Sequence, residues 1–281
     1  MAGLVVLLQG CSSIVVLNPK GTVGAEEKSL ILTAAGLMLV VIVPVIVMVV
    51  AFAWRYRASN RRARYSPEWS HSRLLEVAIW VVPILIVAVL GYLAWTKSHS
   101  LDPFRPLASA VPPVRIQVVS LDWKWLFIYP DEHVAAVNEV AFPVNTPVDF
   151  FVTSDTVMNS FFIPQLGSQI YTMAGMQTQL HLVATQVGDF AGISANFSGP
   201  GFSRMTFTAR SLPPRDYQAW LARARSSSAA LDEGSYGQLA RPSENDPVRY
   251  FSRVSPNLFD TIIREYMGSH PRPPRPVEMK E

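Results

Sequence analysis

The sequence predicts a membrane protein in which a hairpin of two transmembrane helices is followed by an all-β sandwich and a short C-terminal α-helical extension. Three observations support this class. Charged residues make up only 16% of the 281 residues, whereas about 25% is usual in soluble domains. Residues 29–54 and 77–96 contain no charged side chain. Beyond residue 97, short β-branched and aromatic segments alternate with Pro, Gly, Asn and Asp, which is typical of β-structure.

The first ten residues, MAGLVVLLQG, form an apolar stretch that ends directly before Cys11. We expect residues 1–10 to be a lipoprotein signal peptide. The segment Leu8-Gln9-Gly10-Cys11 resembles a bacterial lipobox, in which the Cys becomes the lipidated N-terminus. No Lys or Arg precedes the apolar stretch. A start further upstream, and an inert Cys11 in a leftover apolar leader, therefore stay open as alternatives.

Residues 11–97 are expected to form an external N-terminal segment and the membrane hairpin. At about 1.5 Å per helical residue, some 20 residues cross a hydrocarbon core of about 30 Å. Spans at about 29–54 and 77–96 are therefore long enough. In the intervening loop, 55–76, residues 55–73 carry six Arg and one Glu. Because basic loops stay on the cytoplasmic side, both termini and the β domain are expected outside.

The formal net charge of +3 comes from this loop. Without residues 55–73 the chain has 18 basic and 20 acidic residues. The composition therefore indicates no nucleic-acid surface. The loop itself is expected to be a topology signal that also contacts anionic membrane lipid. A single Cys excludes an internal disulfide framework and a multi-cysteine zinc or iron–sulfur site.

Residues 98–211 are expected to form the β domain. Its strands are predicted at residues 115–121, 123–129, 134–142, 148–152, 177–184 and 205–209. Along the second strand, Trp123, Trp125, Phe127 and Tyr129 alternate, and this pattern favours sandwich core over an exposed stacking platform.

The C-terminal segment 212–270 is expected to be a helical extension. Tyr217, Trp220, Leu221 and Ala224 recur at the spacing of an amphipathic helix, and a second such pattern spans residues 258–266. The last residues, 271–281, are rich in Pro and are expected to be unordered.

Three segments carry a family resemblance: DWKWLFIYP from Asp122, NSFFIPQLGSQIYTMAGMQTQLHLVA from Asn159, and GISANFSGPGFSRM from Gly192. In this order after two helices, the chain resembles subunit II of the haem–copper terminal oxidases, and most of all the cytochrome bo-type ubiquinol oxidase subunit II. The resemblance extends over nearly the whole chain. It implies a transmembrane hairpin in a bacterial inner membrane and a periplasmic, cupredoxin-like Greek-key sandwich.

The resemblance also implies that a metal site has been lost. Copper-containing members bind a dinuclear copper centre through two His, two Cys, a Glu and a Met, because soft sulfur and imidazole suit copper electron transfer. This sequence has other residues at those positions, except for the Met. The matching residues are Asn159, Ser194, Asn196, Ser198, Phe202 and Met205. We therefore expect no metal bound by this chain.

The implied activity belongs to a complex. The resemblance implies oxidation of ubiquinol by O2, which yields ubiquinone and water and is coupled to proton pumping in the respiratory chain. It implies haems and copper in subunit I, the main partner, with subunits III and IV also present and no cytochrome c as donor. This chain would hold no catalytic residue. It would cap and anchor subunit I and support assembly.

Glu76 is the one candidate for a direct role, as the entrance of a proton path into subunit I. It lies one residue before the second apolar run, and the resemblance assigns this entrance to the Glu in WSHSRLLE. A carboxylate at a membrane edge can exchange protons with water. From the residues alone, a purely local role is favoured, because negative charge stabilises a helix N-terminus and Ser72 is suited to cap the same turn.

Two other functions stay open. A menaquinol oxidase of the same superfamily would also lack the copper ligands. An autonomous cupredoxin-like lipoprotein, either a copper chaperone or an assembly module, would need metal ligands that this sequence does not have. The sequence does not separate ubiquinol from menaquinol. It also leaves open the haem types of subunit I, the acylation of Cys11 and the oligomeric state of the complex.

Overall fold

The computed structural model describes residues 14–63 and 68–267. Its internal contacts divide the chain into two units. One unit is Glu27–Asp102, and the other combines Met1–Glu26 with Pro103–Glu281.

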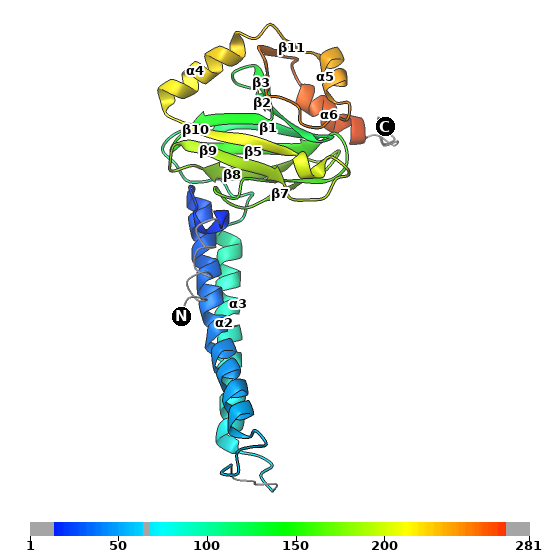
Figure 1. Cartoon of the computed structure of the whole chain (residues 1–281). Helices are drawn as coiled ribbons and strands as arrows, with labels where there is room; N and C mark the ends of the chain where they lie inside the picture. The colour runs from blue at the N-terminus through cyan, green and yellow to red at the C-terminus, as the bar shows by residue number, and fades with distance from the viewer. Residues whose placement is uncertain (1–13, 64–67, 268–281) are drawn as a thin grey trace. The chain divides into compact units, whose positions relative to one another are not determined.

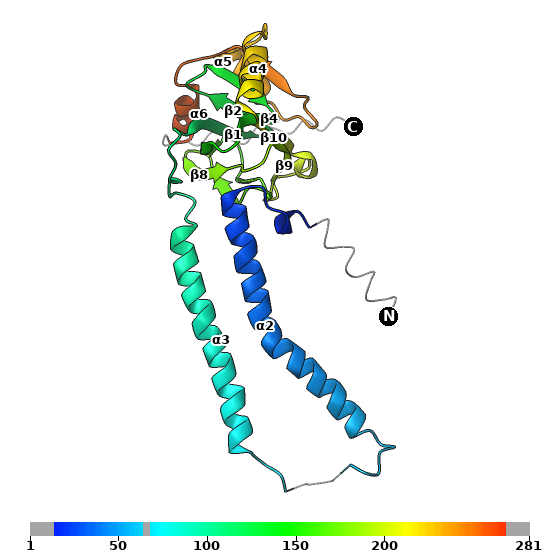
Figure 2. The ribbon, with the colours of Figure 1, turned by 90° about the vertical axis from the view of Figure 1, so that its left-hand side faces the viewer.

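The first unit is built from two long helices, α2 (Thr22–Arg55) and α3 (Arg73–Ser100), which run antiparallel (Figures 1 and 2). The predicted spans at residues 29–54 and 77–96 lie inside them. Both helices also include polar residues on either side of these spans. The hydrocarbon core limits the length of the apolar run and not the length of the helix. Over the most apolar 18 residues of each helix, no residue is buried within the chain. Lipid or other subunits are therefore needed to cover these side chains.

In the second unit, the described strands form a sandwich of two large sheets (Figure 1). Across the first sheet, the strands are β12 (Arg249–Phe251), β3 (Val134–Val137), β2 (Lys124–Tyr129), β1 (Val114–Leu121), β5 (Pro147–Ser154) and β8 (Thr178–Val183). Across the second, they are β4 (Glu139–Pro143), β10 (Thr206–Leu212), β9 (Gly188–Ser194), β6 (Asn159–Phe162) and β7 (Ile170–Thr172). The pairs β1–β5 and β4–β10 are parallel, and the other pairs in these two sheets are antiparallel.

The sandwich core contains the aromatic residues of β2. Trp125, Phe127 and Tyr129 are buried in it, together with Trp123 just before the strand, so the prediction of core over stacking platform is confirmed. The intervening residues Leu126 and Ile128 are buried as well, in a second cluster. Both faces of β2 are therefore covered, which explains why residues 125–129 are apolar throughout and do not strictly alternate with polar residues.

Most predicted strands are present, but the single strand predicted at residues 134–142 is wrong. Residues 134–142 form two strands, β3 and β4, because Asn138 adopts a left-handed conformation with φ of 57°. Asn tolerates this region better than most residues. The two strands then join different sheets.

The C-terminal extension contains α4 (Pro214–Arg225), α5 (Glu233–Leu239) and α6 (Leu258–Met267). The two predicted helices correspond to α4 and α6, whereas α5 and the short parallel pair β11 (Ala230–Leu231) and β13 (Arg253–Val254) were not predicted. Strand β12 pairs with β3, so the extension completes the first sheet. Its residues also form the second buried cluster with one face of β1 and β2.

The segment before α2 and the first turn of that helix contact the β domain. It contains a short 3-10 helix, η2 (Val15–Leu17). Lys20 N donates to Gln165 O at 2.6 Å, and Gly24 N donates to Leu166 O at 2.9 Å. A Cβ atom at Gly21 would lie 2.6 Å from Val183 O. Only glycine therefore allows this close approach of the two backbones.

Candidate functional site

The residues predicted to replace the copper ligands come together at one end of the second sheet. Asn159 begins β6, Ser194 ends β9, and Met205 follows the short helix η3 (Phe202–Arg204). The strands β6 and β9 are neighbours, with Phe161 opposite Ser194. Backbone pairing alone therefore gathers residues that are far apart in the sequence.

A hydrogen bond joins the two buried polar members of the group. Ser194 Oγ donates to Asn159 Oδ1 at 3.0 Å, and these residues are 5% and 1% exposed. Asn159 Nδ2 donates to Val157 O at 3.2 Å. Because buried polar groups are costly without partners, these bonds satisfy both side chains within the chain itself.

The remaining members are held by the backbone or by packing. Asn196 Nδ2 donates to Met158 O at 3.0 Å. Ser198 Oγ lies 4.0 Å from Met205 Sδ, a weak hydrogen-bond distance. Phe202 differs from the others, since its ring packs edge-on against Phe197 with centroids 5.6 Å apart.

This set of donors does not fit a dinuclear copper centre. It offers amide and hydroxyl oxygens and one thioether, all neutral, whereas copper electron-transfer sites use thiolate and imidazole. The oxygens of Asn159 and Ser194 also face each other at hydrogen-bond distance. Among residues 14–63 and 68–267, no three His, Cys, Asp or Glu side chains are grouped as a metal site would need.

Trp123 supports the loop between β9 and β10 through contacts that were not predicted from the sequence. Its Nε1 donates to Ser198 O at 3.0 Å. A Cβ atom at Gly201 would lie 2.4 Å from the indole ring, and Gly199 has a φ of 114°. Neither position accepts a larger residue without rearrangement. In the sequence, the segment Ser-Gly-Pro-Gly at 198–201 was the one indication of a tight loop at this place.

A second unpredicted cluster surrounds Glu139. This residue is 7% exposed and accepts hydrogen bonds from Trp220 Nε1 at 2.7 Å and from Tyr250 Oη at 2.6 Å. Arg210 Nη1 lies 3.3 Å from the other carboxylate oxygen. The cluster connects β4 and β10 to α4 and β12. Burial and the nearby Glu139 carboxylate raise the pKa of Tyr250 to about 12.

Glu76 lies in the first turn of α3, in the first unit. Its side chain is exposed and makes no ion pair or hydrogen bond with other described residues. Its backbone N–H donates to Ser72 O at 2.9 Å. Ser72 is the N-cap residue, but its side chain accepts no capping hydrogen bond. Ser72 therefore occupies the expected N-cap position, but it contributes only its backbone and not the expected side-chain hydrogen bond.

Cys11, the predicted lipidation site, lies outside the described residues.

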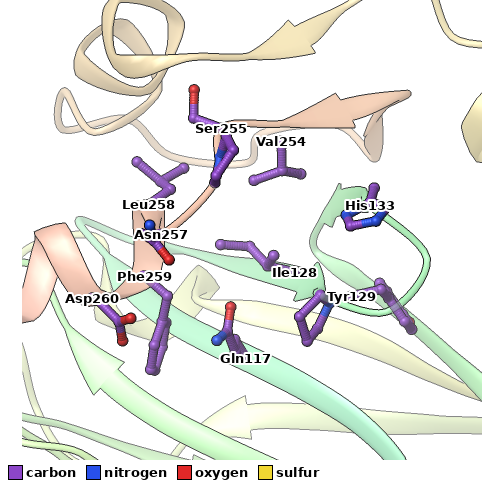
Figure 3. A pocket seen from close by; sticks show the side chains of 12 residues that line it. Gln117, Ile128, Tyr129, His133, Val254, Ser255, Asn257, Leu258, Phe259 and Asp260 are labelled. Carbon is purple, nitrogen blue, oxygen red and sulfur yellow. The ribbon is translucent and has the colours of Figure 1, made fainter.

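A separate pocket of about 290 Å³ lies between β1, β2 and the segment that leads into α6 (Figure 3). Gln117, His133 and Asn257 are among the polar residues that line it, and Ile128 and Phe259 are among the apolar ones. None of the residues at the predicted copper-ligand positions lines this pocket. It therefore lies apart from the candidate site.

Two family models match the second unit. The model described as "Cytochrome C oxidase subunit II, periplasmic domain" matches residues 132–212, and the model "COX Aromatic Rich Motif" matches residues 225–270. The first model covers most of the sandwich from β3 to β10. The predicted cupredoxin-like fold class is confirmed.

Similar proteins match over most of this chain. The "Cytochrome bo(3) ubiquinol oxidase subunit 2" of Pseudomonas aeruginosa is 57% identical over 92% of this chain and 78% of that protein. The "Ubiquinol oxidase subunit 2" of Acetobacter aceti is 52% identical over 92% of this chain and 85% of that protein. The "Probable quinol oxidase subunit 2" of Staphylococcus aureus is 37% identical over 89% and 67%. The predicted family is thus confirmed, and the chain belongs to subunit II of the cytochrome bo-type ubiquinol oxidases.

Proposed function

We propose that this chain is the subunit II of a proton-pumping quinol oxidase and contributes anchoring and assembly without a redox centre of its own. The hydrogen bond between Ser194 and Asn159 carries this proposal. At positions where the family resemblance implies copper ligands, two neutral side chains satisfy each other. A domain built in this way has no group that could accept one electron from a soluble protein.

The electron donor follows from the lack of such a group. A one-electron protein donor such as cytochrome c needs an acceptor near the docking surface. Ubiquinol dissolved in the bilayer can instead deliver electrons laterally within the membrane. The haems and copper that use these electrons, and that reduce O2 to water, would then be bound by subunit I.

Ubiquinol is the substrate that we propose, with menaquinol as the alternative. Two relatives that are named as ubiquinol oxidases are 57% and 52% identical to this chain, whereas the relative named only as a quinol oxidase is 37% identical. This difference favours ubiquinol. The contacts to the quinol itself would lie in subunit I.

The hairpin is proposed to anchor the complex in a bacterial inner membrane, with the loop between α2 and α3 in the cytoplasm and the β domain in the periplasm. The unburied apolar surfaces of α2 and α3 support a helical membrane partner. Subunit I would be the main partner, and subunits III and IV would complete the complex. The domain limits at residues 97 and 211 remain proposals as well, and so do the removal of residues 1–10 and the lipidation of Cys11.

Glu76 is proposed as the entrance of a proton path into subunit I. Its exposed carboxylate at the start of a transmembrane helix supports this role, because it has no partner among the described residues that would fix its charge. Such a group can exchange protons with water and with a neighbouring polar chain.

A donor comparison tests the proposed function. Oxygen uptake by the purified complex would be measured with a soluble ubiquinol analogue, with a menaquinol analogue and with reduced cytochrome c, together with metal analysis. We expect rapid uptake with ubiquinol, none with cytochrome c, and one copper per complex. Turnover with cytochrome c, or three coppers per complex, would overturn the proposal. Faster uptake with menaquinol would replace ubiquinol by the alternative substrate.

The remaining alternative, an autonomous copper-binding lipoprotein, predicts a different result. Such a protein would purify without haem and would bind copper by itself. The neutral, mutually bonded side chains of Asn159 and Ser194 argue against it.

A further inference from the structure

The cytoplasmic-loop end of α2 is marked by exposed aromatic side chains. Phe52, Trp54 and Tyr56 are all more than half exposed, and the rings of Phe52 and Tyr56 lie 6.4 Å apart. The uncharged run of α2 ends at Trp54, and the helix itself ends at Arg55. Trp and Tyr concentrate where the hydrocarbon core meets the headgroups, so the turn that follows lies at headgroup depth.

This turn is held by its own polar contacts. Asn60 Nδ2 donates to Arg55 O at 2.6 Å, and Asn60 N donates to Arg57 O at 2.9 Å. Arg62 N donates back to Asn60 Oδ1 at 3.2 Å. Asn60 thereby closes the end of α2 and fixes the backbone that carries the following arginines.

The guanidinium of Arg57 is fixed in place as well. Its Nη1 donates to Trp54 O at 2.9 Å, its Nε donates to Ser59 Oγ at 3.0 Å, and its Cζ lies 5.0 Å from the centre of the Trp54 ring. Two of the five guanidinium N–H groups are used in this way. The others remain available, on a planar group whose orientation is already set.

The turn also concentrates positive charge. Arg55, Arg57, Arg61 and Arg62 lie within eight residues, all exposed, and residues 55–63 contain no acidic residue. None of the four arginines forms an ion pair with another described residue. Cations also complement a helix C-terminus, and here Arg57 donates to the Trp54 carbonyl while Asn60 donates to the Arg55 carbonyl. The helix end therefore accounts for one N–H group of Arg57, and it does not account for the charges of Arg55, Arg61 and Arg62.

We propose that this turn binds the phosphodiester headgroup of an anionic glycerophospholipid, with Arg57 as the oriented ligand and Arg55, Arg61 and Arg62 as supporting charges. Guanidinium groups bind phosphate oxygens through paired, charge-assisted hydrogen bonds. Aromatic side chains on the preceding turn hold the site at the depth of the lipid phosphates. A general attraction between a basic loop and an anionic membrane requires no oriented side chain, whereas the contacts of Arg57 provide one.

Hydrogen exchange on the full-length chain, purified with the subunits that accompany it, tests this site. After delipidation in detergent, exchange of the segment 52–63 would be followed at fixed ionic strength during titration with phosphatidylglycerol, phosphatidylcholine or inorganic phosphate. Phosphatidylglycerol is expected to slow exchange, and the other two are not. Equal protection by phosphatidylcholine would mean that segment 52–63 is protected by insertion into any lipid. Equal protection by inorganic phosphate would mean that the turn binds a free anion and not a lipid headgroup. Either result overturns the proposal.

Matched variants separate the site from general charge. Arg57→Gln is expected to raise the phosphatidylglycerol concentration for half-maximal protection about tenfold, which corresponds to one charge-assisted hydrogen bond. Arg73→Gln removes one charge from the same loop but lies at the start of α3, and it is expected to have little effect. Equal losses in these two variants would overturn the proposal. Arg57→Lys, which keeps the charge without the planar group, is expected to restore binding only in part, and full restoration would overturn the role of the oriented guanidinium.

Discussion

Ser194 Oγ donates a hydrogen bond to Asn159 Oδ1 across 3.0 Å, between side chains 35 residues apart in the sequence. Both residues are buried where the start of β6 lies beside the end of β9. The contact therefore joins the two strands at the end of the sandwich where copper-containing relatives are implied to bind metal. If these positions match the ligand positions as the resemblance implies, a neutral hydrogen bond takes the structural place of metal–ligand bonds.

Ser194→Ala is expected to destabilise the β domain, because Asn159 Oδ1 would then be buried without its donor. The cost of an unsatisfied buried group is about 1–3 kcal/mol. In the purified complex, this domain should unfold at a lower temperature. The unfolding would be measured as the temperature at which the domain loses its resistance to protease. Ser203→Ala, an exposed serine in the adjacent helix η3, should have no effect. Equal unfolding temperatures in the two variants would show that the bond contributes nothing.

Restoring metal ligands tests whether the loop geometry still permits copper. The combined change of Asn159→His, Ser194→Cys, Asn196→Glu, Ser198→Cys and Phe202→His supplies soft donors beside Met205. We expect the purified complex to gain two copper ions and a visible absorption from copper–thiolate bonds. The change also removes the hydrogen bond between Asn159 and Ser194, so the metal-free variant should be less stable than the wild type.

The control for this experiment carries only the two His substitutions, at Asn159 and Phe202, and should bind no dinuclear copper. If the full variant folds but its copper content equals that of the control, the path of the loop around Trp123, and not only its ligands, has changed. The closeness of Gly201 to the Trp123 ring makes that path sensitive to substitution.

Removing the Glu139 carboxylate should loosen the C-terminal extension. Glu139→Ala leaves Trp220 Nε1 and Tyr250 Oη without their acceptor. We expect a loss of about 3 kcal/mol, the lower end for a broken buried ion pair, because Arg210 remains partly exposed. Limited proteolysis should then cleave after α4 more rapidly.

The ion pair between Glu132 and Arg225 provides the matched control. It also connects α4 to the sandwich, but both side chains are substantially exposed. Glu132→Ala should therefore change stability by no more than about 1 kcal/mol. Equal cleavage rates in the two variants would contradict a specific role for Glu139.

The raised pKa of Tyr250 predicts a loss of stability at high pH. Burial and the hydrogen bond to Glu139 raise its pKa from 10.0 to about 12 in the folded chain. A raised pKa favours the neutral form in the folded state. The stabilisation is therefore fully present below pH 10 and is lost as the pH rises to about 12. Tyr250→Phe should show a smaller fall in unfolding temperature over this interval, whereas parallel curves would contradict the assignment.

Much of the fold could be predicted because its signals are local. The long uncharged runs identify α2 and α3, and the apolar periodicity identifies α4 and α6. Strands β6, β7 and β9 were missed for local reasons as well. β6 and β7 have only four and three residues, and β9 contains two glycines, Gly188 and Gly192. Asn138 gave no sequence signal that the chain would change sheets there.

The candidate site was predictable only in part. The family pattern named the residues that are predicted to replace the ligands, and the pairing of β6 with β9 brings Asn159 and Ser194 together. Glu139 could not be identified, because its partners Trp220 and Tyr250 lie 81 and 111 residues away. Local periodicity places each residue on its own element. It does not indicate which helix of the extension packs against β4.

Glu76 provides the direct test of a proton path. Glu76→Ala should slow quinol-driven oxygen uptake about tenfold to hundredfold, while haem content and assembly stay normal. The upper limit of this slowing is the smallest effect, about hundredfold, that is usual for a positioned proton-transfer group. Glu76→Asp, which keeps the carboxylate, should recover part of the rate. Glu68→Ala removes another exposed carboxylate from the same loop and should leave turnover unchanged. If Glu76→Ala matches the wild type at every pH, its carboxylate serves only the first turn of α3, where negative charge complements the helix dipole.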